Sequence, residues 1–189
     1  MAFTLIIGPI KSGKSLELIA RVAPYEFANK KVVYVQPHKN VRDDGITSRL
    51  GISTNAQRVK TLAEVADDVD VIGIDEVHML PVSDAAYIED WLKRDKEVVV
   101  SGLDIDYSAT LTPMVVKLLQ LKPDLVINKL SVCEVCRQHN AQFTQIIDNG
   151  KLVLGGLPAV VPEDGTYQYQ ARCRACFKKK DPNGKVRVK

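Results

Sequence analysis

The apolar positions of this chain alternate between short continuous runs and helical spacing. Continuous apolar runs are typical of strands that are buried on both faces, and they occupy residues 3–7, 31–35, 71–74, 97–101 and 125–129. Apolar residues at helical spacing predict helices over 14–29, 61–66, 83–93 and 113–121. We expect Ser83 to cap the third helix and Pro113 to open the fourth. Residues 36–56 show no clear periodicity and predict a mobile loop.

Strands that alternate with helices predict an α/β fold, in which a mostly parallel sheet is covered by helices on both faces. Near Val132 this alternation ends, and cysteine pairs, glycines and tyrosines replace it. We therefore predict an α/β domain over 1–130 and a small second domain over 131–178. The remaining residues, 179–189, are basic and are predicted to be a disordered tail.

Composition adds limits on the partners and the compartment. The chain has 189 residues, of which 46% are hydrophobic and 26% charged, and its net charge of +3 is too small to indicate a nucleic acid or membrane partner. No apolar run approaches the roughly 20 residues that cross a bilayer. The N-terminus lacks the basic region of a signal peptide. We predict a cytoplasmic protein, in which the four cysteines stay reduced.

The first strand leads into a phosphate-binding loop. Residues 8–15 fit the pattern G-x-x-x-x-G-K-[ST] between a strand and a helix, which is the context that the motif requires. Backbone N–H groups in such a loop hold phosphate oxygens, while Lys14 would bridge the β- and γ-phosphates of ATP and Ser15 would bind Mg²⁺. The predicted nucleotide-binding residues of the loop are Gly8, Pro9, Ile10, Lys11, Ser12, Gly13, Lys14 and Ser15.

An acidic pair, Asp75 and Glu76, follows the buried strand 71–74. The carboxyl ends of parallel strands meet the phosphate loop at one edge of the sheet. One carboxylate can hold Mg²⁺, and the other can take a proton from an attacking hydroxyl. Val77 and His78 come next and are counted with the nucleotide site, although a lone histidine is more often structural, and we assign His78 no chemistry.

Four cysteines form two C-x-x-C pairs separated by 36 residues: Cys133, Cys136, Cys173 and Cys176. Four thiolates suit one tetrahedral Zn²⁺, and a site closed by four protein ligands is structural rather than catalytic. The long spacing predicts that a segment bulges out between the two pairs. Tyr167 and Tyr169 lie just before the second pair, where they could either pack in a ribbon or stack on a nucleobase.

The order of these features resembles the cellular-type thymidine kinases, which combine a P-loop, RecA-like domain with a zinc-ribbon lasso. The resemblance covers about residues 3–178, and its motifs occupy 8–18, 74–76, 102–107, 129–133 and 169–174. It implies transfer of the ATP γ-phosphate to the 5′-hydroxyl of deoxythymidine, giving dTMP for DNA precursor synthesis. It further implies that Glu76 is the general base and that Asp75 belongs to the Mg²⁺ and ATP site.

The resemblance also implies that a lasso between the cysteine pairs closes over thymine. Tyr169 and Tyr107 occupy positions that line the nucleoside pocket, the latter usually being Phe in the family. Val161 is assigned to the same pocket, although residues 153–156 and 160–162 both resemble the thymine-clasping segment, so the register stays open. By analogy with the family we expect a homotetramer that is inhibited by dTTP.

Several positions depart from the family pattern. Residues 40–42 lack the first carboxylate of an Asp-x-Arg segment, although Arg42 is retained and is assigned to the nucleotide site, with Arg49 as an alternative. Ser108 and Ile146 each stand where the family usually has Arg. These departures keep open a kinase for another pyrimidine deoxynucleoside, such as deoxyuridine. A nucleic-acid-dependent ATPase that uses the basic tail is disfavoured, because no other basic, aromatic-rich face is evident.

Overall fold

A six-stranded sheet forms the centre of the protein. The structure, a computed structural model, describes residues 2–41, 45–161 and 164–179. The strands of this sheet are all parallel and lie in the order β5-β2-β6-β7-β1-β8. Their bounds are β1 Phe3–Ile7, β2 Val32–Pro37, β5 Gln57–Val59, β6 Val71–Ile74, β7 Glu97–Gly102 and β8 Leu125–Asn128. The predicted parallel sheet is confirmed.

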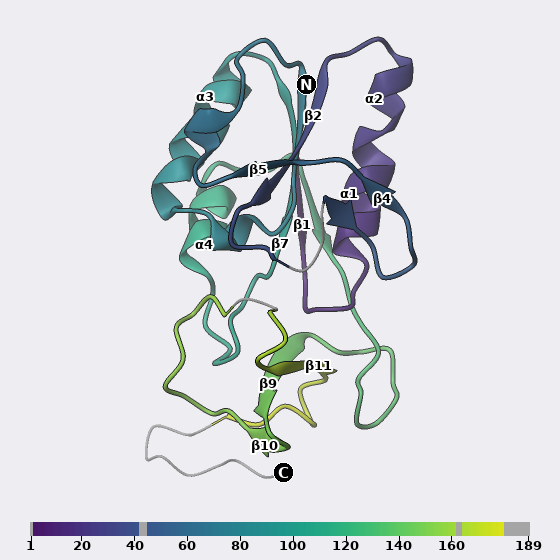
Figure 1. The fold of residues 1–189 in the computed structure, drawn as a ribbon, viewed down its shortest axis with the longest axis vertical. Helices are drawn as coiled ribbons and strands as arrows, with labels where there is room; N and C mark the ends of the chain where they lie inside the picture. Colours follow the sequence, from purple (N-terminus) through teal and green to yellow (C-terminus); the bar gives the residue numbers. More distant parts are fainter. Residues whose placement is uncertain (1, 42–44, 162–163, 180–189) are drawn as a thin grey trace.

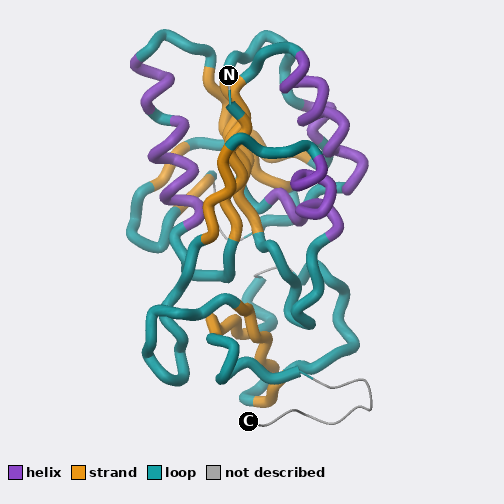
Figure 2. Tube along the Cα trace, turned by 180° about the vertical axis from the view of Figure 1, so that it is seen from behind, coloured by secondary structure: helices purple, strands orange, loops and turns teal. Residues whose placement is uncertain are grey.

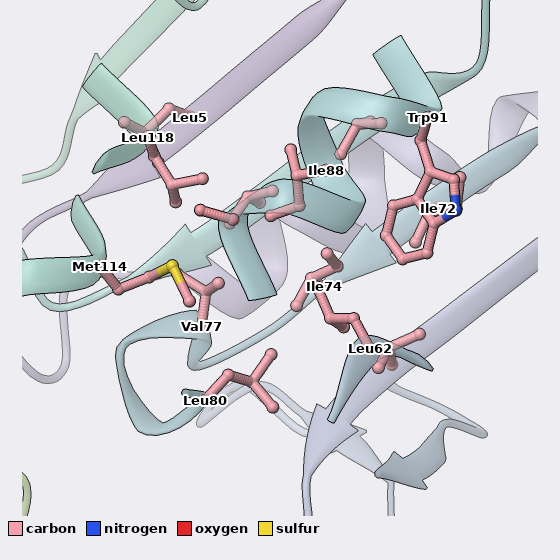
Figure 3. Close-up of a cluster of buried hydrophobic side chains, with 14 of the residues drawn as sticks. Leu5, Leu62, Ile72, Ile74, Val77, Leu80, Ile88, Trp91, Met114 and Leu118 are labelled. Carbon is pink, nitrogen blue, oxygen red and sulfur yellow. The ribbon is translucent and has the colours of Figure 1, made fainter. Parts of the chain in front are cut away.

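Helices cover both faces of this sheet, as predicted (Figure 1). On one face lie α1 (Lys14–Val22) and α2 (Pro24–Phe27), and on the other lie α3 (Ala85–Lys93) and α4 (Pro113–Gln120). The α3 and α4 face holds the larger core, where Ile72 and Ile74 of β6 meet Trp91 of α3 and Met114 of α4 (Figure 3). Burial of these large apolar side chains is the main stabilising term of this layer.

The helix predicted over 14–29 is interrupted. It divides at Ala23 into α1 and α2, with Pro24 as the first residue of the second helix. Proline has no N–H to continue the helical ladder, and its fixed φ suits the first turn of a new helix. The sequence prediction missed this break because the apolar spacing continues across it.

The segment 36–56 is not simply a loop. It contains a two-stranded hairpin of β3 (Ile46–Thr47) and β4 (Ser53–Thr54), and β5 follows it as an edge strand of the main sheet. Strands of two or three residues carry too little apolar pattern to be recognised. They are fixed by their partners, and β5 pairs with the end of β2.

Three short 3₁₀ turns connect the larger elements: η1 Leu62–Glu64, η2 Val77–Met79 and η3 Val82–Asp84. The predicted helix at 61–66 is only η1, which has a capping box between Thr61 and Glu64. Ser83 does not cap α3, because it lies inside η3 and no side chain caps the helix that follows. Asp84 instead accepts hydrogen bonds from Thr61 Oγ1 and Leu62 N, both at 2.8 Å, and so ties the two turns together.

A small antiparallel sheet lies beyond the carboxyl ends of the parallel strands (Figures 1 and 2). It has the order β10-β9-β11, with bounds β9 Phe143–Asp148, β10 Lys151–Leu152 and β11 Gln168–Arg172. No helix among the described residues is long and apolar enough to cross a membrane. The predicted disordered tail, apart from Lys179, lies outside the described residues, as does Arg42. The predicted domain boundary at 130/131 stays a prediction.

Candidate active site

The phosphate loop connects β1 to α1 at the edge of the sheet that faces the small sheet. Its backbone enters the left-handed region at Lys11 (φ 59°) and Gly13 (φ 80°). Lys14 is buried, and its Nζ donates to the carbonyl oxygen of Pro9 at 2.8 Å, which also accepts from Ser12 Oγ at 2.8 Å. Gly8 has φ 146°, and a Cβ there would lie 2.3 Å from the Lys129 carbonyl oxygen, so the loop requires glycine at this point.

Asp75 lies at the end of β6, directly beside the phosphate loop. Its side chain is fully buried and accepts hydrogen bonds from Ser15 Oγ at 2.8 Å and from Ser101 Oγ. Burial, and then the neighbouring Glu76 carboxylate, raise the pKa of Asp75, while the two serine hydroxyls and Lys14 act in the opposite direction. A carboxylate oxygen and a serine hydroxyl in contact form an all-oxygen pair of the kind that Mg²⁺ prefers.

Glu76 adopts a left-handed backbone conformation, with φ 49° and ψ 40°. This conformation costs a non-glycine residue about 1–2 kcal/mol, and such strain is characteristic of functional positions. Glu76 Oε2 lies 3.4 Å from His78 Nδ1, and Nδ1 accepts a hydrogen bond from Leu103 N at 3.2 Å. A ring nitrogen that accepts from a backbone amide has no proton to donate, so Nδ1 makes no hydrogen bond to the Glu76 carboxylate.

A cavity of about 510 Å³ lies over the phosphate loop. Its walls come from the loop, from the β3–β4 hairpin with Arg49, from Glu76, and from the region of the first cysteine pair with Arg137 and His139. Ligand pockets are typically about 300–1,000 Å³, so this cavity is large enough for a nucleotide. The predicted loop residues that line it are Ile10, Lys11, Ser12, Gly13, Lys14 and Ser15.

A second, much smaller cavity lies on the other side of Glu76. Its volume is about 20 Å³, and it is lined by Ile10, Asn40, Glu76, His78, Met79, Leu103, Val161 and Tyr169. The structure thus brings together Tyr169 and Val161, which the sequence assigned to the nucleoside pocket, with the predicted base. Ile10 and Glu76 are the two residues that line both this cavity and the larger one.

The phosphate loop is fastened directly to the small sheet. Lys11 Nζ donates to Glu134 Oε1 at 2.7 Å and to the Tyr169 carbonyl oxygen at 3.2 Å. Ile10 N donates to Thr144 Oγ1 at 3.2 Å. The phosphate loop therefore connects the predicted nucleotide site to the predicted nucleoside site. The connection is made by Ile10 and Lys11, which occupy positions that the phosphate-loop motif leaves variable.

The four cysteines converge, as their spacing predicted. Their sulfur atoms all lie within 4.8 Å of one another, and Cys136 Sγ and Cys173 Sγ are 3.8 Å apart. A tetrahedral zinc with Zn–S distances of about 2.3 Å separates its sulfurs by about 3.8 Å, so the donor set fits this metal. Although burial opposes it, hydrogen bonds from the backbone of Cys136 and Cys173 lower the pKa of Cys133 to about 6, which favours the thiolate that a metal needs.

Four predicted site residues line neither of these two cavities. Val77 is fully buried in the hydrophobic core beside α4 and does not line the cavity over the phosphate loop (Figure 3). Gly8 and Pro9 line neither cavity and instead border a third one, of about 480 Å³, with Asp104 and Lys129. Tyr107 also lines neither of the two cavities around Glu76, and its hydroxyl bonds to the backbone of Leu157.

The sequence reasoning missed Ser101 and gave Asp104 no role. Ser101 ends near Asp75 because β6 and β7 are adjacent parallel strands. Burial raises the pKa of Asp104, whose Oδ1 has no hydrogen-bond partner among the described residues. Ser101 is the last residue of the predicted strand 97–101, and Asp104 follows it closely. Their place was the available signal, since polar residues at the carboxyl ends of parallel strands gather at one edge.

Comparison with known proteins agrees with this geometry. The thymidine kinase family profile matches residues 1–177. The chain belongs to the thymidine kinase family. The resemblance read from the sequence is thereby confirmed, and with it the prediction of a thymidine kinase, an ATP-dependent transferase. The match extends across both sheets and all four cysteines, so the phosphate loop and the cysteine-bearing region belong to one family architecture.

Individual relatives support the same assignment along most of the chain. The thymidine kinase of Mycoplasma capricolum is 33% identical over 184 residues, which cover 92% of this chain and 87% of the relative. That of Chloroflexus aurantiacus is 31% identical over 182 residues, covering 92% of each chain. That of Pseudothermotoga lettingae is 27% identical over 184 residues, covering 93% of this chain and 94% of the relative.

Proposed function

We propose that this protein transfers the γ-phosphate of ATP to the 5′-hydroxyl of deoxythymidine and produces dTMP. The observation that carries this proposal is the position of Glu76, whose carboxylate lies between the phosphate-loop cavity and the cavity under Tyr169. A group there can contact a phosphate donor on one side and a nucleoside hydroxyl on the other. Phosphoryl transfer needs such positioning more than it needs covalent chemistry.

In this proposal the phosphate loop binds the donor. Backbone N–H groups of residues 11–15 hold the phosphate oxygens, and Lys14 leaves its contact with Pro9 to neutralise the charge that develops on the transferred group. Ser15 and Asp75, which already share a hydrogen bond, would hold Mg²⁺. The ion would neutralise phosphate charge. Arg49 lines the same cavity, so we assign to it the phosphate contact for which the sequence offered either Arg42 or Arg49.

Glu76 acts as the general base and accepts the proton of the attacking 5′-hydroxyl. The left-handed backbone conformation of Glu76 sets the direction in which its side chain leaves the chain. Asp75, fully buried and bonded to two serines, has no access to the nucleoside, which supports dividing the two roles in this way.

The acceptor nucleoside binds between Tyr169, Val161 and Leu103, next to Glu76. The four cysteines would hold a structural Zn²⁺, which would fix the two ends of the segment between the cysteine pairs. We further propose a homotetramer in the cytoplasm that is subject to inhibition by dTTP. Apolar side chains exposed on α4 and β8, among them Leu119 and Leu125, support contacts between subunits.

A panel of nucleosides tests the proposal. Purified protein with Mg²⁺ and ATP is incubated with deoxythymidine, deoxyuridine, deoxycytidine and the purine deoxynucleosides, and monophosphates are separated by chromatography. We expect dTMP as the main product. Preference for deoxyuridine would redirect the proposal to another pyrimidine. ATP hydrolysis that DNA or RNA stimulates, with no nucleoside product from folded, zinc-loaded protein, would refute the kinase assignment.

A further inference from the structure

The hydroxyl of Tyr107 makes two hydrogen bonds to one residue of the lasso. It donates to the carbonyl oxygen of Leu157 at 2.7 Å and accepts from the amide N–H of Leu157 at 3.0 Å. These two residues are 50 positions apart in the chain. The phenolic group thus satisfies both backbone groups of a single residue, and a phenylalanine ring in the same place would satisfy neither.

Tyr107 lies in a hairpin between β7 and α4 that several hydrogen bonds hold together. The Asp106 carboxylate accepts hydrogen bonds from Ser108 N at 2.8 Å, from Ser108 Oγ at 2.6 Å and from Thr110 N at 2.9 Å. The hairpin is closed further by the bridge of Ile105 with Leu111. The Tyr107 side chain itself is buried. The tyrosine is therefore the fixed partner of the contact with Leu157.

The partner segment, residues 154–161, has little structure of its own. It belongs to no helix or strand, and it includes Gly155 (φ 159°) and Gly156 (φ 89°), which lower the cost of moving the backbone. Within the described part of the chain, the segment makes three hydrogen bonds. Two are those to Tyr107, and the third joins the Val161 carbonyl oxygen to Tyr169 Oη at 3.3 Å.

The two ends of this segment have different relations to the acceptor cavity. Val161 and Tyr169 form its wall, whereas Leu157 and Tyr107 do not line it. A cavity of about 20 Å³ holds little more than one water molecule, which needs about 10–15 Å³. A nucleoside can therefore enter only if the walls of this cavity move outward. Among the described residues, the Val161 end of the segment is held by one hydrogen bond, at 3.3 Å, so it is the wall that moves most easily.

We propose that the Tyr107 hydroxyl anchors the lasso at Leu157, so that the segment from Leu157 to Val161 moves about this fixed point to admit the nucleoside. In this proposal Tyr107 is a positioning residue for nucleoside binding. The anchor keeps the segment near its bound position and so reduces the entropy lost on binding. The role in turnover rests on the proposed function, whereas the anchor itself does not.

Tyr107→Phe tests the anchor by removing one oxygen atom. The loss of two hydrogen bonds is expected to raise KM for deoxythymidine about tenfold, while kcat and KM for ATP stay close to wild type. Hydrogen exchange of the Leu157 amide, followed by mass spectrometry without any nucleoside, is expected to accelerate by about the same factor. Exchange in β1 and β7 should not change.

Tyr87→Phe is the matched control, because Tyr87 lies on the outer side of α3 and is 40% exposed. It should alter neither KM nor exchange at Leu157. Unchanged Leu157 exchange in Tyr107→Phe would overturn the anchor. Accelerated exchange with an unchanged KM, or a fall in kcat alone, would overturn its role in nucleoside binding. Accelerated exchange in a protein whose wild type phosphorylates no nucleoside would support the anchor and refute the proposed function.

Discussion

The two sheets of this protein are stabilised in different ways. The parallel sheet is enclosed by two clusters of buried apolar side chains, one under α3 and α4 and one under α1. Among the described residues, the buried cluster of the small sheet consists of Ile10, Cys133, Ala141, Ala171 and Cys173, while Ile146, Ile147 and Phe177 are buried separately. Two of the cluster residues are among the four proposed metal ligands, and Ile10 belongs to the phosphate loop.

This difference teaches that the small sheet relies less on apolar burial than the parallel sheet does. Its buried cluster is smaller than either cluster of the parallel sheet, and it has to offset the entropy of ordering a loop-rich segment. A metal bound by four thiolates supplies a compensating term of about 10–16 kcal/mol in comparable small domains. The phosphate loop supplies the remaining support through Ile10 and Lys11, so the weaker region is built onto the stronger one.

Metal removal should give the largest effect. A chelator, or the variant Cys173→Ser, is expected to abolish nucleoside phosphorylation and to remove exchange protection from β9 and β11. Protection in β6 and β7 should persist, because the apolar core encloses these strands. Metal analysis before treatment should give about one zinc per chain, the stoichiometry of a single four-cysteine site.

Ser83→Ala, in an exposed turn of the parallel-sheet region, is the control for the cysteine variant and should keep both metal and activity. If β9 and β11 stayed protected after the metal had left, the contrast between the two sheets would be wrong. Loss of protection throughout the molecule would show instead that the two sheets unfold together.

Glu76→Gln should give the next largest effect. The substitution keeps the size of the side chain but removes the base, so kcat is expected to fall by about 10²–10⁴-fold. ATP binding, measured by calorimetry, should stay near wild type, since the phosphate loop is untouched. Glu89→Gln on α3, where the carboxylate pairs with the exposed Lys93, is the matched control. A variant that retained most of its rate would exclude Glu76 as the base.

Lys11→Ala should give the smallest effect. It removes the half-exposed ion pair with Glu134 and the bond to the Tyr169 carbonyl oxygen, through which the phosphate loop supports the acceptor side. Partly exposed pairs are weak, so KM for deoxythymidine should rise only about two- to fivefold. Lys31→Ala removes the exposed pair with Asp68 on another part of the surface and should leave KM unchanged. Equal effects of the two variants would show that Lys11 does not link the regions.

Much of the site could be predicted because each motif is local. The loop from Gly8 to Ser15, the acidic pair and the cysteine pairs are fixed by spacing and side-chain chemistry, and the structure places each at the expected edge or cluster. Val77 shows the limit of this reasoning. Adjacent to Glu76 in sequence, it points into the core, because neighbouring side chains at a strand end take different directions.

What the sequence by itself determined was the alternation of most parallel strands with helices, the phosphate loop, the acidic pair and the two cysteine pairs. The periodicity of apolar residues and short motifs depend only on residues close together in the sequence, so they can be recognised without knowledge of the fold. Only the tertiary structure placed Glu76 between two cavities, joined Lys11 to Glu134, and set the Tyr107 hydroxyl on Leu157. These contacts join residues tens of positions apart, and long-range packing rather than local pattern decides them.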